Sequence, residues 1–512
     1  MADASLIFQR HGTMLVTPGD GFDAIVRTVR SCAQLRSIVA GNYLFDFAPV
    51  ALWGAIGRGQ SVEQMIADLE RYASMPIPTA LAAKIAETAA QLGAIRVVDG
   101  ACGPEVVVRD PARFANLGIV PPSAGSLQMP LKLDDVARIK LAGIRAGWPV
   151  VDERRRVASG SPISLADGTC LRPYQRESLR AFEAGRDGVV LLPCGAGKTV
   201  VGIAAAAATG GPVLVLVPSR SVGEQWLTTF ANLTTSGKGG AGWLDGSVDG
   251  LVSTVTYQAA TVGKAAGMLA GRRWRLVIYD EVQSLPADMF RLAAAIEADR
   301  RLGLSATLVR EDGREAEVFA LVGPPLYEES WLELERDGWI APARCVEVRV
   351  PAAVSETDSL RYRMAVVQRL LAQHEDEPVL VVGTDVRGLQ AIGKRLEFPV
   401  LTGSSSPERR ERLLGEFRSG SLRRLGLSRI GSVGIDLPDA SVLIQVSGTF
   451  GSRQEEAQRL GRLLRPAPGK TAHFYTIVAE GTREQHYAAR RQRFLVNQGY
   501  IYDILDASSL PR

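Results

Sequence analysis

A short glycine-containing loop between an apolar segment and an alanine-rich one carries the clearest chemistry in this sequence. The loop comprises Gly195, Ala196, Gly197, Lys198 and Thr199. Backbone N–H groups of such a loop, together with the positive end of a following helix, bind phosphate. A lysine at this spacing reaches the β- and γ-phosphates, and the threonine hydroxyl holds Mg²⁺. A loop that merely turns the chain needs neither side chain, so we predict a site for ATP and Mg²⁺.

Two adjacent carboxylates at the end of another apolar segment are the predicted partners of this loop. Asp280 and Glu281 follow Leu276–Tyr279, and α/β proteins build their sites at the carboxyl ends of such strands. We predict that Asp280 holds Mg²⁺ together with Thr199, and that Glu281 orients and deprotonates the attacking water. Acidic pairs after strands are often plain surface turns, and the upstream Lys198 is what favours the catalytic interpretation.

A basic helical face near the C-terminus is predicted to act on the same phosphates. The segment Gly451–Pro466 is predicted to be one helix that begins with a capping box at Ser452. Gln458, Arg462 and Arg465 have the i, i+4, i+7 spacing of one helical face. Basic faces are usually only solvated, but this one belongs to a region without a phosphate loop of its own. We therefore predict arginine fingers, which accelerate phosphoryl transfer by about 10³–10⁵.

Two series of short apolar runs are expected to position these residues. The runs lack polar alternation, as strands buried on both faces of a parallel sheet do. The first series is Val189–Pro193, Val213–Pro218, Val252–Thr256, Leu276–Asp280 and Leu302–Thr307. The second series is Val379–Gly383, Val400–Gly403, Leu422–Ser428, Val442–Ser447 and Phe474–Val478. They predict two α/β domains joined near Trp339–Pro351, with a single larger α/β enzyme as the alternative.

Residues 1–125 differ from the rest and are predicted to form a mainly helical accessory domain. A strand is expected at Leu6–Val16, and a helix is expected to begin after Ser61, which forms a capping-box pattern with Gln64. A second helix is expected at Pro78–Leu92, and a hairpin at Ile95–Val98 and Val106–Arg109. Helices followed by a hairpin are compatible with a winged-helix DNA module and equally with a plain packing domain. Residues 126–165 are expected to be a partly helical connector, and Arg154–Arg156 a solvated cluster.

Length and composition limit the remaining classes of protein. With 512 residues, of which 46% are hydrophobic and 22% charged, the chain is long enough for about three domains with buried cores. We find no transmembrane run, and Met1–Arg10 lacks a signal-peptide pattern, so a cytoplasmic protein without a membrane partner is expected. Five cysteines and four histidines are dispersed and show neither disulfide nor zinc-site spacing. A net charge of +4 permits a nucleic-acid partner.

Together these segments resemble the superfamily 2 helicases, and within them the XPB family. The similarity rests on four motifs: Leu171–Gln175, Pro193–Thr199, Arg310–Asp312 after Ser305–Thr307, and Phe450–Arg462. It covers residues 166–505 and extends to Ala51–Val98. The resemblance implies an α/β fold with two tandem RecA-like parallel-sheet domains, at residues 166–342 and 343–512.

The same resemblance implies an activity and a set of roles. It implies an ATP-hydrolysing DNA helicase that moves 3′ to 5′ and acts in DNA repair on single-strand or forked duplex DNA, with a nuclease or other repair protein as a candidate partner. Arg172 and Gln175 are expected to face the adenine, and Gly434 and Asp436 to belong to the nucleotide contact of motif V. The residues expected to couple hydrolysis to DNA movement are Ser305, Thr307, Arg310, Glu311 and Asp312.

Three departures from the family pattern leave alternatives open. Leu192 stands where the strict phosphate-loop motif has glycine, and Gln283 stands where the acidic motif ends in histidine. The segment Val350–Met364 is short, so the inserted DNA-gripping thumb of the family is expected to be reduced or missing. The alternatives are a double-strand DNA translocase that does not unwind and an ATP-gated DNA-binding scaffold. The core motifs do not by themselves distinguish DNA from RNA.

Overall fold

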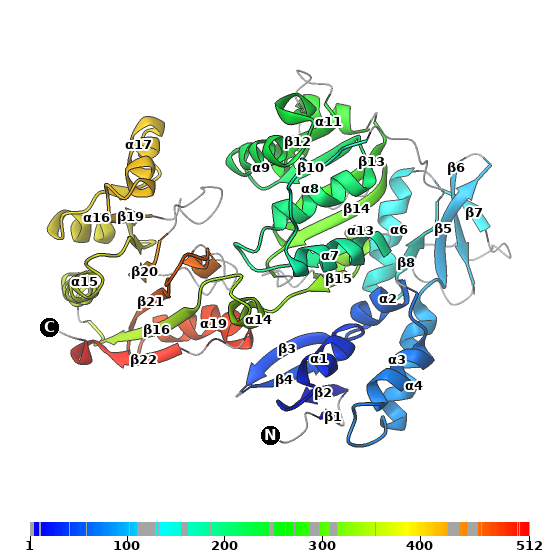
Figure 1. Cartoon of the computed structure of the whole chain (residues 1–512), viewed down its shortest axis with the longest axis horizontal. Helices are drawn as coiled ribbons and strands as arrows, with labels where there is room; N and C mark the ends of the chain where they lie inside the picture. Colours follow the sequence, from blue (N-terminus) through cyan, green and yellow to red (C-terminus); the bar gives the residue numbers. More distant parts are fainter. Residues whose placement is uncertain are drawn as a thin grey trace. The chain divides into compact units, whose positions relative to one another are not determined.

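The structure is a computed structural model, and it describes most of the chain. The described residues are 5–9, 12–39, 41–57, 59–101, 103–109, 128–131, 133–154, 162–184, 187–244, 250–261, 263–270, 272–285, 296–307, 315–353, 355–428, 440–447, 459–461, 463–498, 500 and 502–510. They form two compact units, one of Met1–Leu191 with Gly197–Glu328 and the other of Leu192–Ala196 with Glu329–Arg512. Figure 1 shows the elements of each unit along the chain. No helix among the described residues is long and apolar enough to cross a membrane.

The first part of unit one is an antiparallel sheet with four helices. Its strands, in the order β1-β2-β4-β3, are β1 (Leu6–Phe8), β2 (Thr13–Val16), β4 (Asn42–Asp46) and β3 (Gln34–Val39). The helices are α1 (Phe22–Arg30), α2 (Pro49–Gly57), α3 (Val62–Glu70) and α4 (Thr79–Gln91). The predicted cap is confirmed, since Ser61 Oγ accepts from the Gln64 N–H at 3.1 Å. The region is mixed rather than mainly helical, because Tyr43 and Phe45 alternate as buried residues along β4.

Residues 126–165 are partly helical, as expected of the connector, and they also contribute two strands to a second small sheet. Its order is β7-β6-β5-β8, with β7 (Gln128–Pro130), β6 (Gly103–Val108), β5 (Ile95–Gly100) and β8 (Val150–Asp152). The predicted hairpin is β5–β6, and β7 and β8 extend it on either side. Helix α6 (Leu133–Arg145) packs on this sheet through Ile139. Arg154 is not a solvated side chain but pairs with Asp152 at 2.8 Å.

The first parallel sheet contains every strand predicted for the first series and two more. Its order is β11-β12-β10-β13-β14-β9-β15, with β11 (Ala241–Trp243), β12 (Val252–Thr256), β10 (Val213–Val217), β13 (Trp274–Asp280), β14 (Ala298–Ser305), β9 (Gly188–Leu191) and β15 (Pro325–Glu328). Its helices are α7 (Pro173–Ala184), α8 (Lys198–Thr209), α9 (Arg220–Leu233), α10 (Tyr257–Thr261), α11 (Gly263–Ala270) and α13 (Glu315–Val322). The edge strands β11 and β15 lack the uninterrupted apolar run of the predicted strands, since β11 contains a glycine and β15 contains a proline and a glutamate.

Helices cover both faces of this sheet. Val318 and Leu321 of α13 share a buried core with Val189 and Leu214. On the opposite face, Gly202 of α8 lies so close to the sheet that a Cβ there would contact the Leu304 side chain at 3.0 Å. This double burial explains the uninterrupted apolar runs that predicted the strands.

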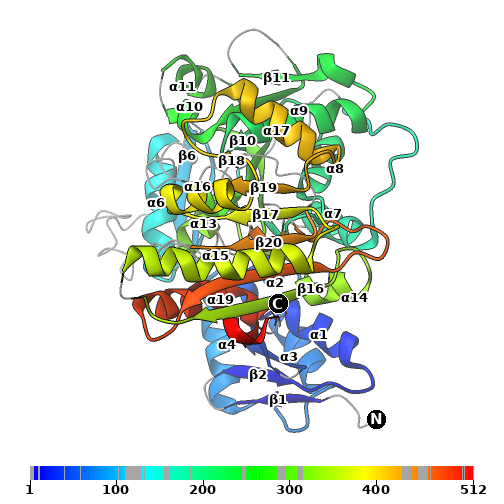
Figure 2. The same ribbon diagram turned by 90° about the vertical axis from the view of Figure 1, so that its left-hand side faces the viewer.

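Unit two holds a second parallel sheet, and Figure 2 shows its strands with helices α15 and α16 in front. The order is β18-β19-β17-β20-β21-β16-β22, with β18 (Val400–Leu401), β19 (Arg424–Leu427), β17 (Val379–Val382), β20 (Val442–Gln445), β21 (Ala472–Ala479), β16 (Ala343–Val350) and β22 (Tyr502–Asp506). The helices are α14 (Trp331–Arg336), α15 (Glu356–Gln373), α16 (Val386–Arg395), α17 (Pro407–Arg418) and α19 (Arg483–Asn497). The fold is thus α/β with two parallel sheets, as predicted, and each sheet has seven strands rather than the five expected.

The segment expected to join the two domains, Trp339–Pro351, is instead part of this sheet. Residues Ala343–Val350 form β16, which pairs in parallel with both β21 and β22. Arg344, Glu347 and Arg349 interrupt the apolar run and obscured the strand in the sequence. Their charges are balanced by neighbours, as in the pair of Arg349 Nε with Glu347 Oε1 at 3.1 Å.

Candidate nucleotide-binding site

The predicted phosphate loop has the backbone that phosphate binding requires. Gly195 and Gly197 have φ angles of +84° and +81°, which side chains with a Cβ rarely adopt. At Gly197 an added Cβ would also lie 2.5 Å from Gln175 Nε2. Helix α8 begins at Lys198, and no side chain caps its N-terminus at Gly197. The first N–H groups of α8 therefore suit an anion.

Asp280 ends β13 and is held in a buried position. The Trp226 Nε1–H of α9 donates to Asp280 Oδ2 at 2.8 Å, and the Glu281 N–H donates to Oδ1 at 3.0 Å. Trp226 reaches this position because Gly202 of α8 has no side chain; a Cβ there would lie 2.4 Å from the indole. Burial and the Glu281 charge raise the pKa of Asp280 to about 6.

Glu281 lies beside the loop lysine. Lys198 Nζ is 3.4 Å from Glu281 Oε1, and the lysine side chain is largely buried. Glu281 has φ 49° and ψ 53°, a left-handed conformation that costs a residue with a side chain about 1–3 kcal/mol. Strain of this kind persists where the surrounding structure holds it in place, often at functional sites. The loop and the acidic pair are thus brought together as predicted.

Gln283 connects this acidic pair to the end of the neighbouring strand. Its Nε2 donates to Glu281 Oε2 at 2.6 Å, and its Oε1 accepts from the Ser305 hydroxyl. The Thr307 N–H in turn donates to Ser305 Oγ at 3.1 Å. Lys198, Glu281, Gln283, Ser305 and Thr307 therefore form one continuous polar chain. An amide can both donate and accept, which lets Gln283 make both contacts in place of the expected histidine.

The residues expected on the adenine side lie at the start of α7. The Arg172 N–H donates to Gln175 Oε1 at 2.9 Å, and Arg172 Nη1 donates to the Tyr174 hydroxyl at 3.0 Å. Gln175 is buried and its amide lies against Gly197. The segment before α7 is thereby connected to the phosphate loop.

The basic C-terminal segment is only partly described. Leu460, Leu463 and Leu464 are fully buried. The helical conformation ends at Leu463, so Arg465 follows the helix and does not continue its face as expected. The sequence interpretation missed Arg459, whose buried Nη1 donates to Gln445 Oε1 at 2.7 Å.

Several predicted site residues lie outside the described residues. They are Arg310, Glu311, Asp312, Gly434, Asp436, Gln458 and Arg462, together with the capping box at Ser452.

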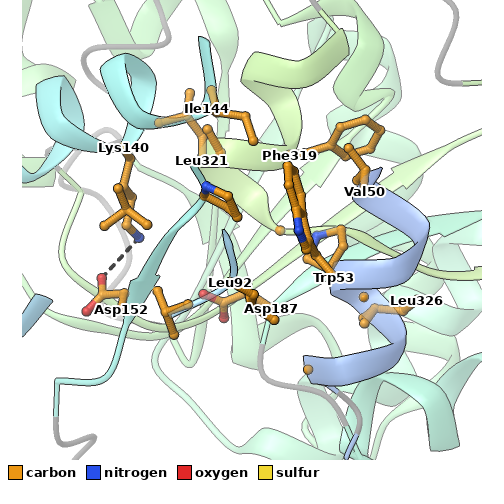
Figure 3. Close-up of a pocket in the computed structure, with 18 residues that line it drawn as sticks. Val50, Trp53, Leu92, Lys140, Ile144, Asp152, Asp187, Phe319, Leu321 and Leu326 are labelled. Carbon is orange, nitrogen blue, oxygen red and sulfur yellow. Dashed lines mark hydrogen bonds and ion pairs between the residues drawn. The ribbon is translucent and has the colours of Figure 1, made fainter. Parts of the chain in front are cut away.

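A separate cavity of about 180 Å³ lies within unit one, between α2, α6 and α13 (Figure 3). Apolar side chains such as Trp53, Ile144 and Phe319 line it, and none of its lining residues belongs to the predicted nucleotide site. At one end Lys140 Nζ pairs with Asp152 Oδ2 at 3.0 Å, both side chains being more than 90% buried. Three distant segments build this cavity, which explains why sequence patterns did not indicate it.

Asp152→Asn is expected to destabilise unit one by about 3–5 kcal/mol, because it leaves the buried Lys140 ammonium without its ion-pair partner. Burial alone would raise the pKa of Asp152, but Lys140 and Arg154 hold it well below its usual range. The contribution of Asp152 is therefore present above about pH 4 and is lost as the pH falls below that value. Urea unfolding at pH 7 measures the cost of the substitution, and unfolding of the parent at about pH 2 measures the loss of the Asp152 contribution.

Asp46→Asn is the matched control, because Asp46 forms an exposed pair with Arg36 at 3.3 Å. Its expected cost is at most about 1 kcal/mol. If both variants lowered the free energy of unfolding equally, the buried Lys140–Asp152 pair would contribute no more to stability than an exposed pair.

Three family models match separate parts of the chain. Residues 334–510 match the ERCC3/RAD25/XPB C-terminal helicase. Residues 169–310 match the res subunit of type III restriction enzymes, and residues 6–117 match a helicase conserved C-terminal domain. The second match includes the phosphate loop and the acidic pair.

Similar proteins and structures agree with these matches. The chain is 39% identical to a DNA 3′-5′ helicase XPB of Kineococcus radiotolerans, over all of this chain and 98% of that protein. It is also 39% identical to the protein of the same name in Mycobacterium tuberculosis, over all of this chain and 99% of that one. A solved fragment described as an HsdR subunit of a type I restriction enzyme from Vibrio vulnificus shares the fold, with a TM-score of 0.50 and 18% identity over 66% of this chain and 69% of that chain.

Proposed function

The chain belongs to the XPB helicase family, and on that premise we propose that it is an ATP-dependent DNA helicase that moves 3′ to 5′. The observation that carries the proposal is the polar chain from Lys198 through Glu281 and Gln283 to Ser305. It links the predicted site of hydrolysis to the strand end predicted to couple it to DNA. We infer that its substrate is single-stranded or forked DNA in DNA repair, with a nuclease or other repair protein as partner.

The residues of the site fit ATP and Mg²⁺. The uncapped N-terminus of α8 and the positive-φ glycines suit the phosphates, with Lys198 at the β- and γ-phosphates. Thr199 and the Asp280 carboxylate would hold Mg²⁺, which when bound neutralises phosphate charge. Glu281 would orient the attacking water and accept its proton, and Gln283 holds the Glu281 carboxylate in place.

The remaining roles are drawn from the family motifs. Arg172 and Gln175 would face the adenine, and Gly434 with Asp436 would contact the nucleotide. Arg462 and Arg465, with Gln458, would stabilise the charge of phosphoryl transfer. The triplet Arg310, Glu311 and Asp312 would act on DNA. These assignments are tested by substitution, one motif at a time.

One observation favours a second candidate, a double-strand DNA translocase. Strand β16 ends at Val350 and α15 already begins at Glu356, which leaves no room there for an inserted thumb. A forked-duplex unwinding assay beside a DNA-stimulated ATPase assay decides between the two. We expect stimulated ATPase with strand separation. Stimulation without strand separation would support the translocase, and an ATPase indifferent to DNA would contradict both.

Gln283→Leu is expected to uncouple the two activities. Leucine keeps the volume but removes both contacts of the amide. Because Glu281 keeps its ion pair with Lys198, basal ATPase should fall only a few-fold. Stimulation by DNA should fall up to about tenfold, because a hydrogen bond contributes about 0.5–1.5 kcal/mol and about 1.4 kcal/mol corresponds to a factor of ten. The control is Gln225→Leu at an exposed position of α9. If DNA stimulates the ATPase of Gln283→Leu as strongly as that of the control, the polar chain does not couple hydrolysis to DNA binding.

A further inference from the structure

Two of the four histidines, which the sequence places far apart, meet in unit two. His374 directly follows α15, and Glu377 closes the turn after it, its N–H donating to the His374 carbonyl at 3.3 Å. His473 is the second residue of β21, and Tyr475 lies two residues further on the same face of that strand. The rings of His374 and His473 have centroids 4.8 Å apart.

The polar atoms of this cluster, which we call the histidine cluster (His374, Glu377, His473 and Tyr475), are close together. His374 Nδ1 lies 2.7 Å from Glu377 Oε1, and His374 Nε2 lies 2.9 Å from the Tyr475 hydroxyl. One ligand atom from each of His374, Glu377 and His473 lies within 4.8 Å of the other two. Among the residues that the structure describes, this is the one group of three or more histidine, cysteine and acidic residues with such spacing.

One feature of the cluster is unusual for a hydrogen-bond network alone. The His473 Nδ1 atom is buried and has no hydrogen-bond partner among the described residues, and an unpaired polar atom of this kind costs about 1–3 kcal/mol. In one neutral tautomer of His374, Nδ1–H donates to Glu377 and the Tyr475 O–H donates to Nε2, so both contacts are ordinary hydrogen bonds. In the other tautomer, Nε2–H donates to the Tyr475 hydroxyl and the Nδ1 lone pair faces the Glu377 carboxylate, which is the arrangement that a cation bound by both atoms would select.

We propose that His374, His473 and Glu377 form a binding site for a divalent transition metal ion of the zinc type. Two imidazoles and one carboxylate are a ligand set that zinc uses, with water in a fourth position. Tyr475 would be the outer partner that orients the His374 ring, as the second ring nitrogen of a metal-bound histidine generally has such a partner. The ligands in a tetrahedral zinc site lie about 2.0–2.1 Å from the ion, so the cluster must contract. Glu377, with a side chain 38% exposed, has the freedom to do so.

The site lies at the opposite sheet edge from the carboxyl strand ends where α/β proteins bind substrates. His473 begins β21 and Glu377 precedes β17. A bound ion would join the end of α15 to the amino ends of two strands of one sheet, and so stabilise unit two. This role is independent of the proposed helicase activity.

Zinc titration of the full chain, followed by calorimetry and by the thermal unfolding temperature, tests the proposal. The parent is expected to bind Zn²⁺ at this site and to melt at a higher temperature with it. His473→Gln should lose one Zn²⁺ per chain and the rise in melting temperature, while keeping its fold, because the removed Nδ1 makes no hydrogen bond. Tyr475→Phe should bind Zn²⁺ about 10–100-fold more weakly.

His486→Gln, at an exposed position of α19, is the matched control and should behave like the parent. Comparing the two histidine variants separates this site from zinc bound elsewhere, for example by the exposed Cys170. Equal zinc stoichiometry in His473→Gln and His486→Gln, or a parent that binds no zinc, would overturn the proposal. The cluster would then be a hydrogen-bond network only.

Discussion

Lys198→Ala is expected to reduce ATP turnover by at least about 10²–10³-fold, the usual effect of removing one preorganised charge-stabilising group. Lys198 is the first residue of α8, and its ammonium group lies 3.4 Å from Glu281 Oε1. At this position the ammonium group would neutralise phosphate charge. Its removal should also weaken nucleotide binding. Phosphate release with and without DNA, together with binding of a fluorescent ATP analogue, measures the two effects.

Lys394→Ala, at an exposed position of α16, is the control for loss of a lysine. Circular dichroism should show that both variants remain folded. Turnover of Lys198→Ala within a few-fold of the parent would mean that the loop does not bind the phosphates, and the assignment of the whole site would be wrong.

Glu281→Gln is expected to stop hydrolysis while leaving ATP binding intact. The amide fills the same volume but cannot accept a proton, and loss of a general base typically costs about 10²–10⁴ in rate. Because Lys198 stays in place, the affinity for ATP should remain within a few-fold of the parent. The variant should therefore accumulate bound, unhydrolysed ATP, which single-turnover experiments measure directly.

Glu183→Gln, exposed on α7, is the matched control and should hydrolyse ATP like the parent. The contrast between Glu281→Gln and Lys198→Ala is the informative comparison. If both variants lose ATP affinity equally, Glu281 acts by holding the loop lysine rather than as the base. Unchanged hydrolysis in Glu281→Gln would place the base elsewhere.

Local patterns in the sequence predicted the central strands of both parallel sheets and grouped the residues of the candidate nucleotide site. Strands buried on both faces need apolar residues at every position, so β10 and β13 stand out as uninterrupted runs. The phosphate loop is equally local, because its glycines, lysine and threonine are neighbours in the chain. Asp280 and Glu281 could be assigned to the same site because carboxyl ends of parallel strands meet at one sheet edge.

Contacts between distant segments needed the tertiary structure. His374 and Tyr475 are 101 residues apart, and Lys140 meets Asp152 only because α6 packs beside β8. Strand β16 has charged side chains that pair within the strand or with β22, as Arg344 does with Asp503, so its sequence pattern did not indicate a strand. The role of Gln283 as a bridge between Glu281 and Ser305 likewise depends on the adjacency of β13 and β14. The sequence by itself determined which residues share a helix, a strand or a loop. Side chains from separate elements were brought together only by tertiary packing, which the spacing of residues within one element does not encode.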